Sequence, residues 1–167
     1  MKTIAIIRHA KSSWTNANLR DHDRPLNARG ERDAPIMAKH LLNNEYQINK
    51  IVTSTAKRAE QTAKSFADLH QVTSDNFYTS PNLYHAGIGD WITVLEEYWH
   101  LVDDSQESLI AFYAHNPGIT NIINWLCDEN LFNVPTCGCA IIGFQDDLER
   151  IDSGVAQLIH YFYPKGI

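Results

Sequence analysis

The sequence has no long hydrophobic run and no excess of positive charge. Its apolar stretches fall well short of the roughly 18 residues that a membrane-spanning helix needs. The stretch near the N-terminus is broken at Arg8, too early for the apolar part of a signal peptide. The net charge of −6 provides no overall basic field for nucleic acid or an anionic membrane. We therefore expect a cytoplasmic protein with neither as a partner, in which any site for an anion is built locally.

Cysteine is scarce, and its pattern argues against two common uses. The three cysteines are Cys127, Cys137 and Cys139. An odd number with Cys-Gly-Cys spacing fits neither a disulfide framework nor a standard zinc site, so we interpret them as structural thiols. The one local group with metal-ligand chemistry is His22 between Asp21 and Asp23, and no further ligand completes a shell around it. We expect no metal site.

Three signature loops are also missing. The sequence contains no Gly-x-x-x-x-Gly-Lys-Ser/Thr loop and no Gly-x-Gly-x-x-Gly after a strand, which argues against the use of nucleoside triphosphates and dinucleotides. It has no Gly-x-Ser-x-Gly nucleophile elbow either. We expect no organic cofactor.

The pattern of what is present indicates an α/β fold. The chain has 167 residues, 44% of them hydrophobic, which suits a single domain over residues 1–167 with a sizeable core. Short apolar runs alternate with segments of helical period, which predicts a largely parallel sheet. The predicted strands are Thr3–Arg8, Lys50–Thr53, Asn76–Thr79, Leu109–Ala114, Ala140–Gln145 and Val155–Tyr163. We expect the last two to form a hairpin at one edge of the sheet.

Helices are predicted between these strands. The expected capping residues, in chain order, are Asn27, Ser54 or Thr55, Asp90 and Asn116. The first helix runs to about Asn43 and contains Pro35, which weakens or kinks it. The last has Pro117 in the first-turn position that proline favours.

The buried faces of these helices follow from their periodicity. The residues assigned to the buried face of the second helix are Ala59, Thr62, Ala63, Phe66 and Leu69. Trp91, Trp99 and Trp125 also recur at helical spacing. We interpret these tryptophans as core residues and not as a stacking platform.

Three segments with chemically active side chains follow predicted strands. Arg8 and His9 follow the first strand, residues 54–58 follow the second, and His115 and Asn116 follow the fourth. Open parallel sheets bind ligands outside the carboxyl ends of their strands. The sequence therefore predicts one site that these segments share.

The residue types in these segments suit phosphoryl transfer. Arg58 lies in the first turn of its helix, where a cation is unfavourable unless a bound anion reverses the effect, whereas its neighbour Lys57 is expected to face solvent. Arg8 and Arg58 could hold the oxygens of a phosphoryl group. His9 would be the nucleophile, with a pKa lowered by the nearby guanidinium groups, and His115 would be a further donor.

Four ordered segments resemble a known family. They are "IIRHAKSSW", "DHDRPLNARGERDA", "TSTAKRAEQTA" and "AHNPGI". They resemble the histidine phosphatase superfamily, in its branch of small SixA-type phosphohistidine phosphatases, over essentially the whole chain. The resemblance implies a three-layer α/β/α sandwich of the phosphoglycerate mutase-like type, with a mostly parallel sheet and no large lid insertion. It also implies that no metal or organic cofactor is needed.

The resemblance assigns roles to individual residues. His9 would be phosphorylated transiently, in a phosphate pocket completed by Arg8, Arg58 and His115. We place Ser12 and Asn116 among the phosphate-binding residues as well. Residues implied to support the first loop are Asp21, Arg24 and Gly30.

The sequence departs from the family pattern in places that bear on the substrate. The usual Arg-His-Gly is Arg-His-Ala here, and Thr15 stands where phosphoglycerate mutases have asparagine, which disfavours a mutase. Larger members take an acid from a mid-chain insertion. The corresponding stretch "NLYHAGIGDWI" offers only Asp90, which we expect first to cap a helix.

The lack of a well-placed acid favours a nitrogen–phosphorus bond. An alkoxide is a poor leaving group that needs a general acid, whereas imidazole leaves more readily because its other nitrogen can already carry the proton. We therefore predict a phosphatase that hydrolyses phosphohistidine on a protein, such as a phosphorelay or phosphotransferase-system carrier. Phosphate or sulfate would also fit the site.

Two alternatives stay open. The first is a small-molecule phosphomonoesterase, with Asp90, Glu96 or Glu97 as the acid. The second is a non-catalytic module that binds phosphorylated ligands. A pure binder has no need of His9 beside the arginine clamp, which argues against the second.

Overall fold

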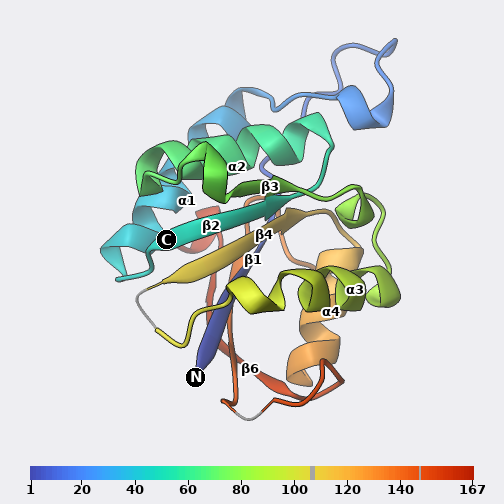
Figure 1. The fold of residues 1–167 in the computed structure, drawn as a ribbon. Coiled ribbons are helices and arrows are strands. Elements are labelled where there is room, and N and C mark those ends of the chain that lie inside the picture. Colours follow the sequence, from blue (N-terminus) through green and yellow to red (C-terminus); the bar gives the residue numbers. More distant parts are fainter. Residues whose placement is uncertain (106–107, 147) are drawn as a thin grey trace.

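The computed structural model describes residues 1–105, 108–146 and 148–167, and it has three layers (Figure 1). A six-stranded sheet of order β3-β2-β4-β1-β5-β6 lies between two layers of helices. The strands are β1 (Lys2–Arg8), β2 (Ile48–Thr53), β3 (Phe77–Thr79), β4 (Leu109–Ala114), β5 (Cys139–Phe144) and β6 (Ala156–Phe162). The predicted strands agree with these to within two residues at each end, and the α/β/α sandwich is confirmed.

The sheet is mostly parallel, as predicted. Strands β3, β2, β4 and β1 all run in one direction. Strand β5 is antiparallel to β1, and β6 pairs with β5 as an antiparallel hairpin at the edge. The carboxyl ends of β1, β2 and β4 therefore meet at one end of the sheet.

The alternation of side chains along the strands produces two apolar cores. In β1, Ile4 and Ile6 face the cluster formed with α3 (Ile88–Tyr98) and α4 (Gly118–Cys127). Ala5 and Ile7 face the opposite cluster, formed with α1 (Ala28–Asn43) and α2 (Lys57–His70). Figure 1 shows α1 and α2 on one face of the sheet and α3 and α4 on the other. Because both faces are covered, β1 reads as a continuous apolar run.

Helix α1 starts as predicted and α2 does not. The Asn27 side chain accepts a hydrogen bond from the Gly30 N–H at 2.9 Å, and α1 continues through Pro35 to Asn43. The predicted Ser54 or Thr55 cap of α2 is wrong, because the residue at that position is Ala56 and no side chain caps the helix. Ser54 lies two residues earlier, where its hydroxyl accepts from the Ala56 N–H at 3.3 Å.

The predicted starts of α3 and α4 are also displaced. Helix α3 begins after Gly87, so Asp90 is its third residue and not its N-cap. Its carboxylate still serves the helix end, because it accepts the Gly87 N–H at 2.9 Å. Helix α4 begins at Gly118, so Asn116 lies outside it and Pro117 takes the N-cap position.

The buried faces agree with the predictions except at one position. Ala59, Thr62, Ala63 and Phe66 are buried on α2, but Leu69 is 39% exposed. The helix instead buries His70, one turn after Phe66, where the imidazole bonds to the Ile48 N–H and the Ala38 carbonyl.

The aromatic and cysteine interpretations are confirmed. Trp91 is fully buried, and Trp99 and Trp125 pack against the same core. Cys137 and Cys139 are buried free thiols whose pKa values burial raises, and half-buried Cys127 has a pKa raised to about 12, mainly by burial. Among the described residues, no helix is both long and apolar enough to cross a membrane.

Candidate active site

The three predicted segments meet in one pocket at the carboxyl end of the sheet. Its volume is about 260 Å³. The described residues that line it are Arg8, His9, Lys11, Ser12, Trp14, Asp21, Arg24, Arg58, His85, His115, Asn116 and Thr136. All the predicted phosphate-site residues are therefore brought together, and Asp90 is not among them.

His9 is held as a neutral imidazole with one nitrogen available. Its Nδ1 lies 2.7 Å from the Ala10 carbonyl oxygen. A carbonyl only accepts, so Nδ1 carries the proton and Nε2 keeps its lone pair. The pKa of His9 is lowered to about 3. Burial is the largest cause, the charges of Arg58 and Arg8 act in the same direction, and the bond to Ala10 opposes them. At neutral pH the ring is therefore uncharged, and Nε2 has the lone pair that a nucleophile needs.

Two guanidinium groups lie on either side of this pocket. Arg8 Nη1 donates to the Val134 carbonyl at 2.9 Å, and Arg58 Nη1 donates to the Asp21 carbonyl at 2.7 Å. The Nε atoms of Arg8 and Arg58 are buried and have no hydrogen-bond partner within the described structure. Buried donors are normally satisfied. These two are therefore suited to the oxygens of a bound anion, at the amino end of α2.

His115 faces His9 across the pocket. The two ring centroids are 5.1 Å apart. His115 Nε2 lies 2.8 Å from Ser54 Oγ, while its Nδ1 is buried and lacks a partner within the described structure. Burial lowers the pKa of His115 to about 2, followed in size by the effects of His9 and Arg58. This ring too is neutral and can donate one hydrogen bond to an anion.

Asp21 ties the first loop to α2. One carboxylate oxygen accepts from Arg58 at 3.0 Å and from the Tyr84 hydroxyl at 2.7 Å, and the other accepts from Arg24. Burial alone would raise the pKa of Asp21, but the hydrogen bonds from Tyr84 and Arg58 outweigh it and hold this pKa well below its usual range. Asp21 is therefore an anion that orients Arg58, and not a proton donor.

The rest of the first loop is organised by Arg24. Its Nη1 donates to Ser12 Oγ at 2.8 Å, and the Trp14 ring lies over its guanidinium at 3.4 Å. Ser12 lines the pocket, and because its hydroxyl oxygen only accepts in this bond, its O–H can still donate to an anion. Gly30 is needed beside it, because a Cβ at that position would lie 2.2 Å from the Lys11 carbonyl oxygen.

Asn116 lines the pocket but its polar atoms hold a neighbouring loop. Its Nδ2 donates to Asn133 and to the Val134 carbonyl, and its Oδ1 accepts from Thr120. Asp90 is exposed and bonded to the Gly87 amide, so the structure does not bring it to the reacting groups.

Two residues at the site, one in the pocket lining and one behind it, were missed by the reasoning from sequence. Tyr84 bonds to Asp21 and packs edge-on against His115, and His85 lines the pocket with its ring 4.0 Å from that of Tyr84. His85 adopts a left-handed backbone (φ 56°), unusual for a residue with a Cβ. The signal for His85 is its imidazole, which can carry a proton as a carboxylic acid does.

The structure offers no metal site among the residues that it describes. His22 Nε2 bonds to Thr55 Oγ1 at 2.8 Å, and its ring packs against Tyr84.

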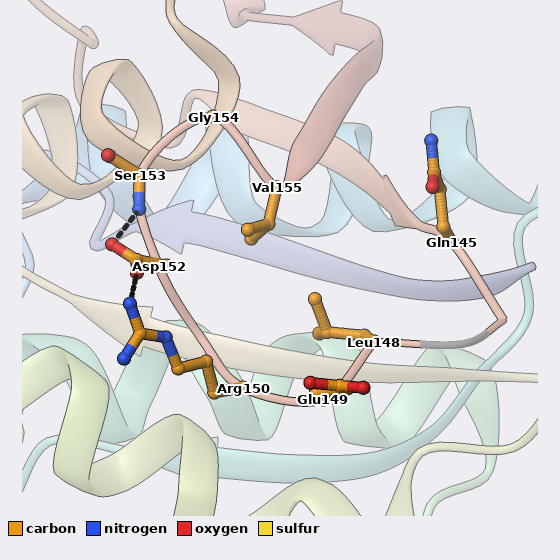
Figure 2. Close-up of a pocket in the computed structure, with 8 residues that line it drawn as sticks. All are labelled: Gln145, Leu148, Glu149, Arg150, Asp152, Ser153, Gly154 and Val155. Atoms are coloured by element: carbon orange, nitrogen blue, oxygen red, sulfur yellow. Dashed lines mark hydrogen bonds and ion pairs between the residues drawn. The ribbon is translucent and has the colours of Figure 1, made fainter.

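A larger hollow of about 510 Å³ lies in the loop between β5 and β6 (Figure 2). Because β5 is antiparallel to β1, this loop lies at the opposite end of the sheet from the pocket. Asp152 there accepts from the Arg150 guanidinium and from the Ser153 N–H. Its described lining contains no histidine, and its one arginine, Arg150, pairs with Asp152. The candidate site is therefore the pocket around His9.

Comparisons with known proteins identify the family of this chain. The sequence pattern of the histidine phosphatase superfamily (branch 1) matches residues 4–115. An uncharacterized chloroplast protein of Arabidopsis thaliana is 30% identical over 144 residues, which are 84% of this chain and 66% of that protein. An uncharacterized protein of Mycobacterium leprae is 29% identical over 95% of this chain and 100% of its own length.

Solved structures share the fold. A SixA protein of Agrobacterium tumefaciens has a TM-score of 0.80 at 22% identity, with 98% of both chains covered. The protein histidine phosphatase SixA in complex with tungstate also has a TM-score of 0.80, at 20% identity and the same coverage. A mycobacterial glucosyl-3-phosphoglycerate phosphatase in complex with VO3 has a TM-score of 0.73 at 13% identity, over 96% of this chain and 98% of its own.

Proposed function

The chain belongs to the histidine phosphatase superfamily, and from this we propose that it hydrolyses phosphohistidine on a protein through a phosphoenzyme at His9. One observation carries the proposal: Nε2 of His9 keeps its lone pair because Nδ1 donates to the Ala10 carbonyl. The nucleophile lies in a pocket with two arginine side chains whose Nε atoms have no partner within the described structure.

The reaction has two displacements. In the first, Nε2 of His9 attacks phosphorus, the bond between phosphorus and the substrate's imidazole nitrogen breaks, and the imidazole leaves with the electron pair. In the second, water attacks phosphorus, the bond to Nε2 breaks, and inorganic phosphate leaves while the water protons pass to phosphate and solvent. His9 returns to its starting state.

The surrounding residues stabilise the transferring group. Arg8, Arg58 and the Nδ1 of His115 are the donors for its oxygens, where charge is spread in the transition state. The tungstate and VO3 bound in the two neighbouring structures support an oxyanion in a site of this fold. Asp21 holds Arg58 by two hydrogen bonds and so keeps the clamp in place.

The leaving group supports phosphohistidine as the substrate. The one carboxylate among the described lining residues is Asp21, whose lowered pKa keeps it ionised and unable to protonate an alkoxide. Imidazole does not need that proton. The described residues include no long insertion over the pocket, so a histidine on a protein surface can enter.

The test is phosphate release from a histidine-phosphorylated protein, measured beside an aryl and an alkyl phosphate with chelator present. We expect fast release from phosphohistidine, slow release from the alkyl ester, and loss of at least 10³-fold in His9→Ala. An acid-labile phosphoenzyme should be trapped in the wild type and not in the variant. Retained turnover in a folded His9→Ala protein would overturn the mechanism. Tight binding of phosphorylated ligands without any phosphoenzyme would instead establish a binding module.

A small-molecule phosphomonoesterase is the second candidate, and the position of His85 favours it. This imidazole lines the pocket from the loop before α3 and can carry the proton that an alkoxide needs. His85→Gln should then lower alkyl phosphate turnover at least tenfold and leave phosphohistidine turnover within twofold. Equal effects on both substrates would remove this support. The control is Asp90→Asn, because Asp90 lies outside the pocket lining.

A further inference from the structure

A second cavity adjoins the candidate active site. It has a volume of about 390 Å³, and we call it the lateral groove, defined by Arg29, Arg32, Asp33, Thr136, Tyr163 and Lys165. Thr136 lines both this groove and the active-site pocket, and Arg29 Nη2 donates to Thr136 Oγ1 at 3.5 Å. A molecule whose phosphoryl group enters the pocket therefore meets the lateral groove immediately beside it.

Chain topology places three separate segments at the lateral groove. Arg29 and Arg32 come from the first turns of α1, which follows the loop after β1. Thr136 comes from the loop before β5, and Lys165 from the short turn after β6. Both β1 and β6 are antiparallel to β5, so they run in the same direction, and their carboxyl ends lie at the same end of the sheet. The groove therefore opens beside the pocket because of the fold.

The lateral groove is cationic. Arg29 and Arg32 both pair with the Asp33 carboxylate, at 3.5 and 3.2 Å. Asp33 is 6% exposed, whereas the two arginine side chains are 44% and 66% exposed. One buried carboxylate thus holds two guanidinium groups at the surface, and exposed Lys165 adds a third cation. The described residues of the groove have a net positive charge.

This charge is concentrated against the balance of the whole chain. Arg8, Lys11, Arg24 and Arg58 line the pocket, and Arg29, Arg32 and Lys165 line the groove. These seven are half of the 14 lysine and arginine residues of a chain that has a net charge of −6. Asp21 and Asp33 are the only acidic residues of the described lining, out of 20 in the chain. An anionic partner is thus attracted to this face and repelled by the rest.

We propose that the lateral groove binds an acidic segment next to the phosphorylated histidine of the protein substrate. This inference rests on the proposed function, since it supplies the second contact that a phosphohistidine on a polypeptide makes. The charges select an acidic segment, and the rings of Tyr163, Pro135 and Pro164 provide an apolar wall for an extended chain. A small aryl phosphate has no polypeptide chain that could extend from the pocket along the groove.

The experiment uses two synthetic phosphohistidine peptides of equal length. In one the residues flanking phosphohistidine are Asp and Glu, and in the other they are Asn and Gln. We expect the wild type to prefer the acidic peptide through a lower KM, with a preference that weakens as salt is raised. Lys165→Glu, at an exposed side chain, should raise KM for the acidic peptide about fivefold and leave kcat within twofold.

Three further measurements make the result specific to the groove. Arg32→Gln removes a charge while Arg29 still pairs with Asp33, and should raise KM for the acidic peptide roughly threefold. Lys64→Glu makes the same change of charge as Lys165→Glu at an exposed position of α2 outside both cavities, and should change nothing. Turnover of p-nitrophenyl phosphate should be equal in all four proteins.

The outcomes separate this inference from the proposed function. Equal turnover of the two peptides by the wild type, or an equal loss in Lys64→Glu, would overturn the groove as a docking site and leave the phosphohistidine activity standing. An equal loss on p-nitrophenyl phosphate would show that the variants disturb the pocket, which also overturns it. Turnover of p-nitrophenyl phosphate with neither peptide hydrolysed would overturn the proposed function, and the docking inference with it.

Discussion

At the scale of single residues, the candidate site depends on which groups are charged. His9 and His115 are neutral because burial lowers their pKa values to about 3 and about 2. Asp21 is ionised because Tyr84, Arg58 and Arg24 all donate to it. The pocket thus combines a neutral imidazole with two guanidinium groups, which is the arrangement that the proposed phosphoryl transfer to nitrogen needs.

The role of Asp21 can be tested by removing its charge. Asp21→Asn keeps the shape of the side chain but loses the anion that orients Arg58 and Arg24. We expect kcat/KM to fall about tenfold to a hundredfold, by analogy with the loss of an orienting partner at other sites. If Asp21 acts by positioning Arg58, KM should rise more than kcat falls, and activity should partly recover at high substrate concentration. Steady-state kinetics measures both constants.

Asp23→Asn is the matched control for this change. Asp23 lies two residues away, pairs with the exposed Arg20 and does not line the pocket. The activity of the Asp23→Asn protein should stay within twofold of the wild type. An equal loss in both variants would mean that the loop conformation matters and that the Asp21–Arg58 contact does not.

At the scale of elements, the start of α1 must pack closely on the loop after β1. The Asn27 N–H donates to the Lys11 carbonyl at 2.9 Å, and Gly30 lies against the same carbonyl. Ser12 pairs with Leu26 as an isolated β-bridge. The loop that projects beyond the sheet in Figure 1 is therefore anchored at its base, next to His9.

Gly30→Ala tests this packing. The new Cβ would lie 2.2 Å from the Lys11 carbonyl oxygen, so α1 or the loop must shift. We expect the free energy of unfolding to fall by about 1–3 kcal/mol and activity to fall with it, as measured by denaturant titration and turnover.

Gly89→Ala separates this packing from the helix propensity of alanine. A Cβ at Gly89 in α3 would meet nothing within 4 Å. Alanine there should be neutral or stabilise the protein by up to about 1 kcal/mol. Destabilisation of equal size at both positions would contradict the close approach at Gly30.

At the scale of the whole molecule, burial of neutral histidines makes stability depend on pH. His9, His115 and His70 all have folded-state pKa values lowered mainly by burial. Protonation of His70 would also break its acceptor bond from the Ile48 N–H. Below the unfolded-state pKa of about 6.5, the unfolded chain binds protons that the folded chain does not.

We therefore expect the free energy of unfolding to be greatest above about pH 7 and to decrease as the pH falls toward 4. Each such histidine lowers it by up to about 1.4 kcal/mol per pH unit in that window. Asp21 contributes no loss there, because its lowered pKa moves its protonation to more acidic solutions. Urea titrations at several pH values measure the slope.

His9→Gln should make this slope shallower by about one histidine's contribution. The control is His100→Gln, because His100 is exposed and its Nδ1 lies 3.0 Å from the Glu97 carbonyl. A slope that is unchanged in His9→Gln would show that the buried imidazole is not the group that resists protonation.

Local sequence patterns accounted for most of the fold. Apolar runs such as Leu109–Ala114 identified the strands because both faces of the sheet are covered, so burial is continuous along them. Helix ends were less predictable. Asp90 and Ser54 both accept backbone N–H groups near a helix start, but neither is the N-cap residue. Asp90 is the third residue of α3, and Ser54 lies two residues before the N-cap of α2. The residue at which a helix starts depends on the conformation of the preceding loop, and the capping side chains alone do not determine that conformation.

The residue types and their places after the strands predicted which side chains form the candidate site, whereas the geometry of the site comes from the tertiary structure. Their positions after parallel strands predicted that Arg8, His9, Arg58 and His115 lie together, because the carboxyl ends of such strands meet at one end of the sheet. The bond between Tyr84 and Asp21 and the position of His85 in the pocket come from contacts between residues far apart in the sequence. The lateral groove depends on β6 running parallel to β1, which brings Lys165 beside Arg29. Such long-range proximity leaves no periodic trace in the sequence, whereas burial and strand ends do.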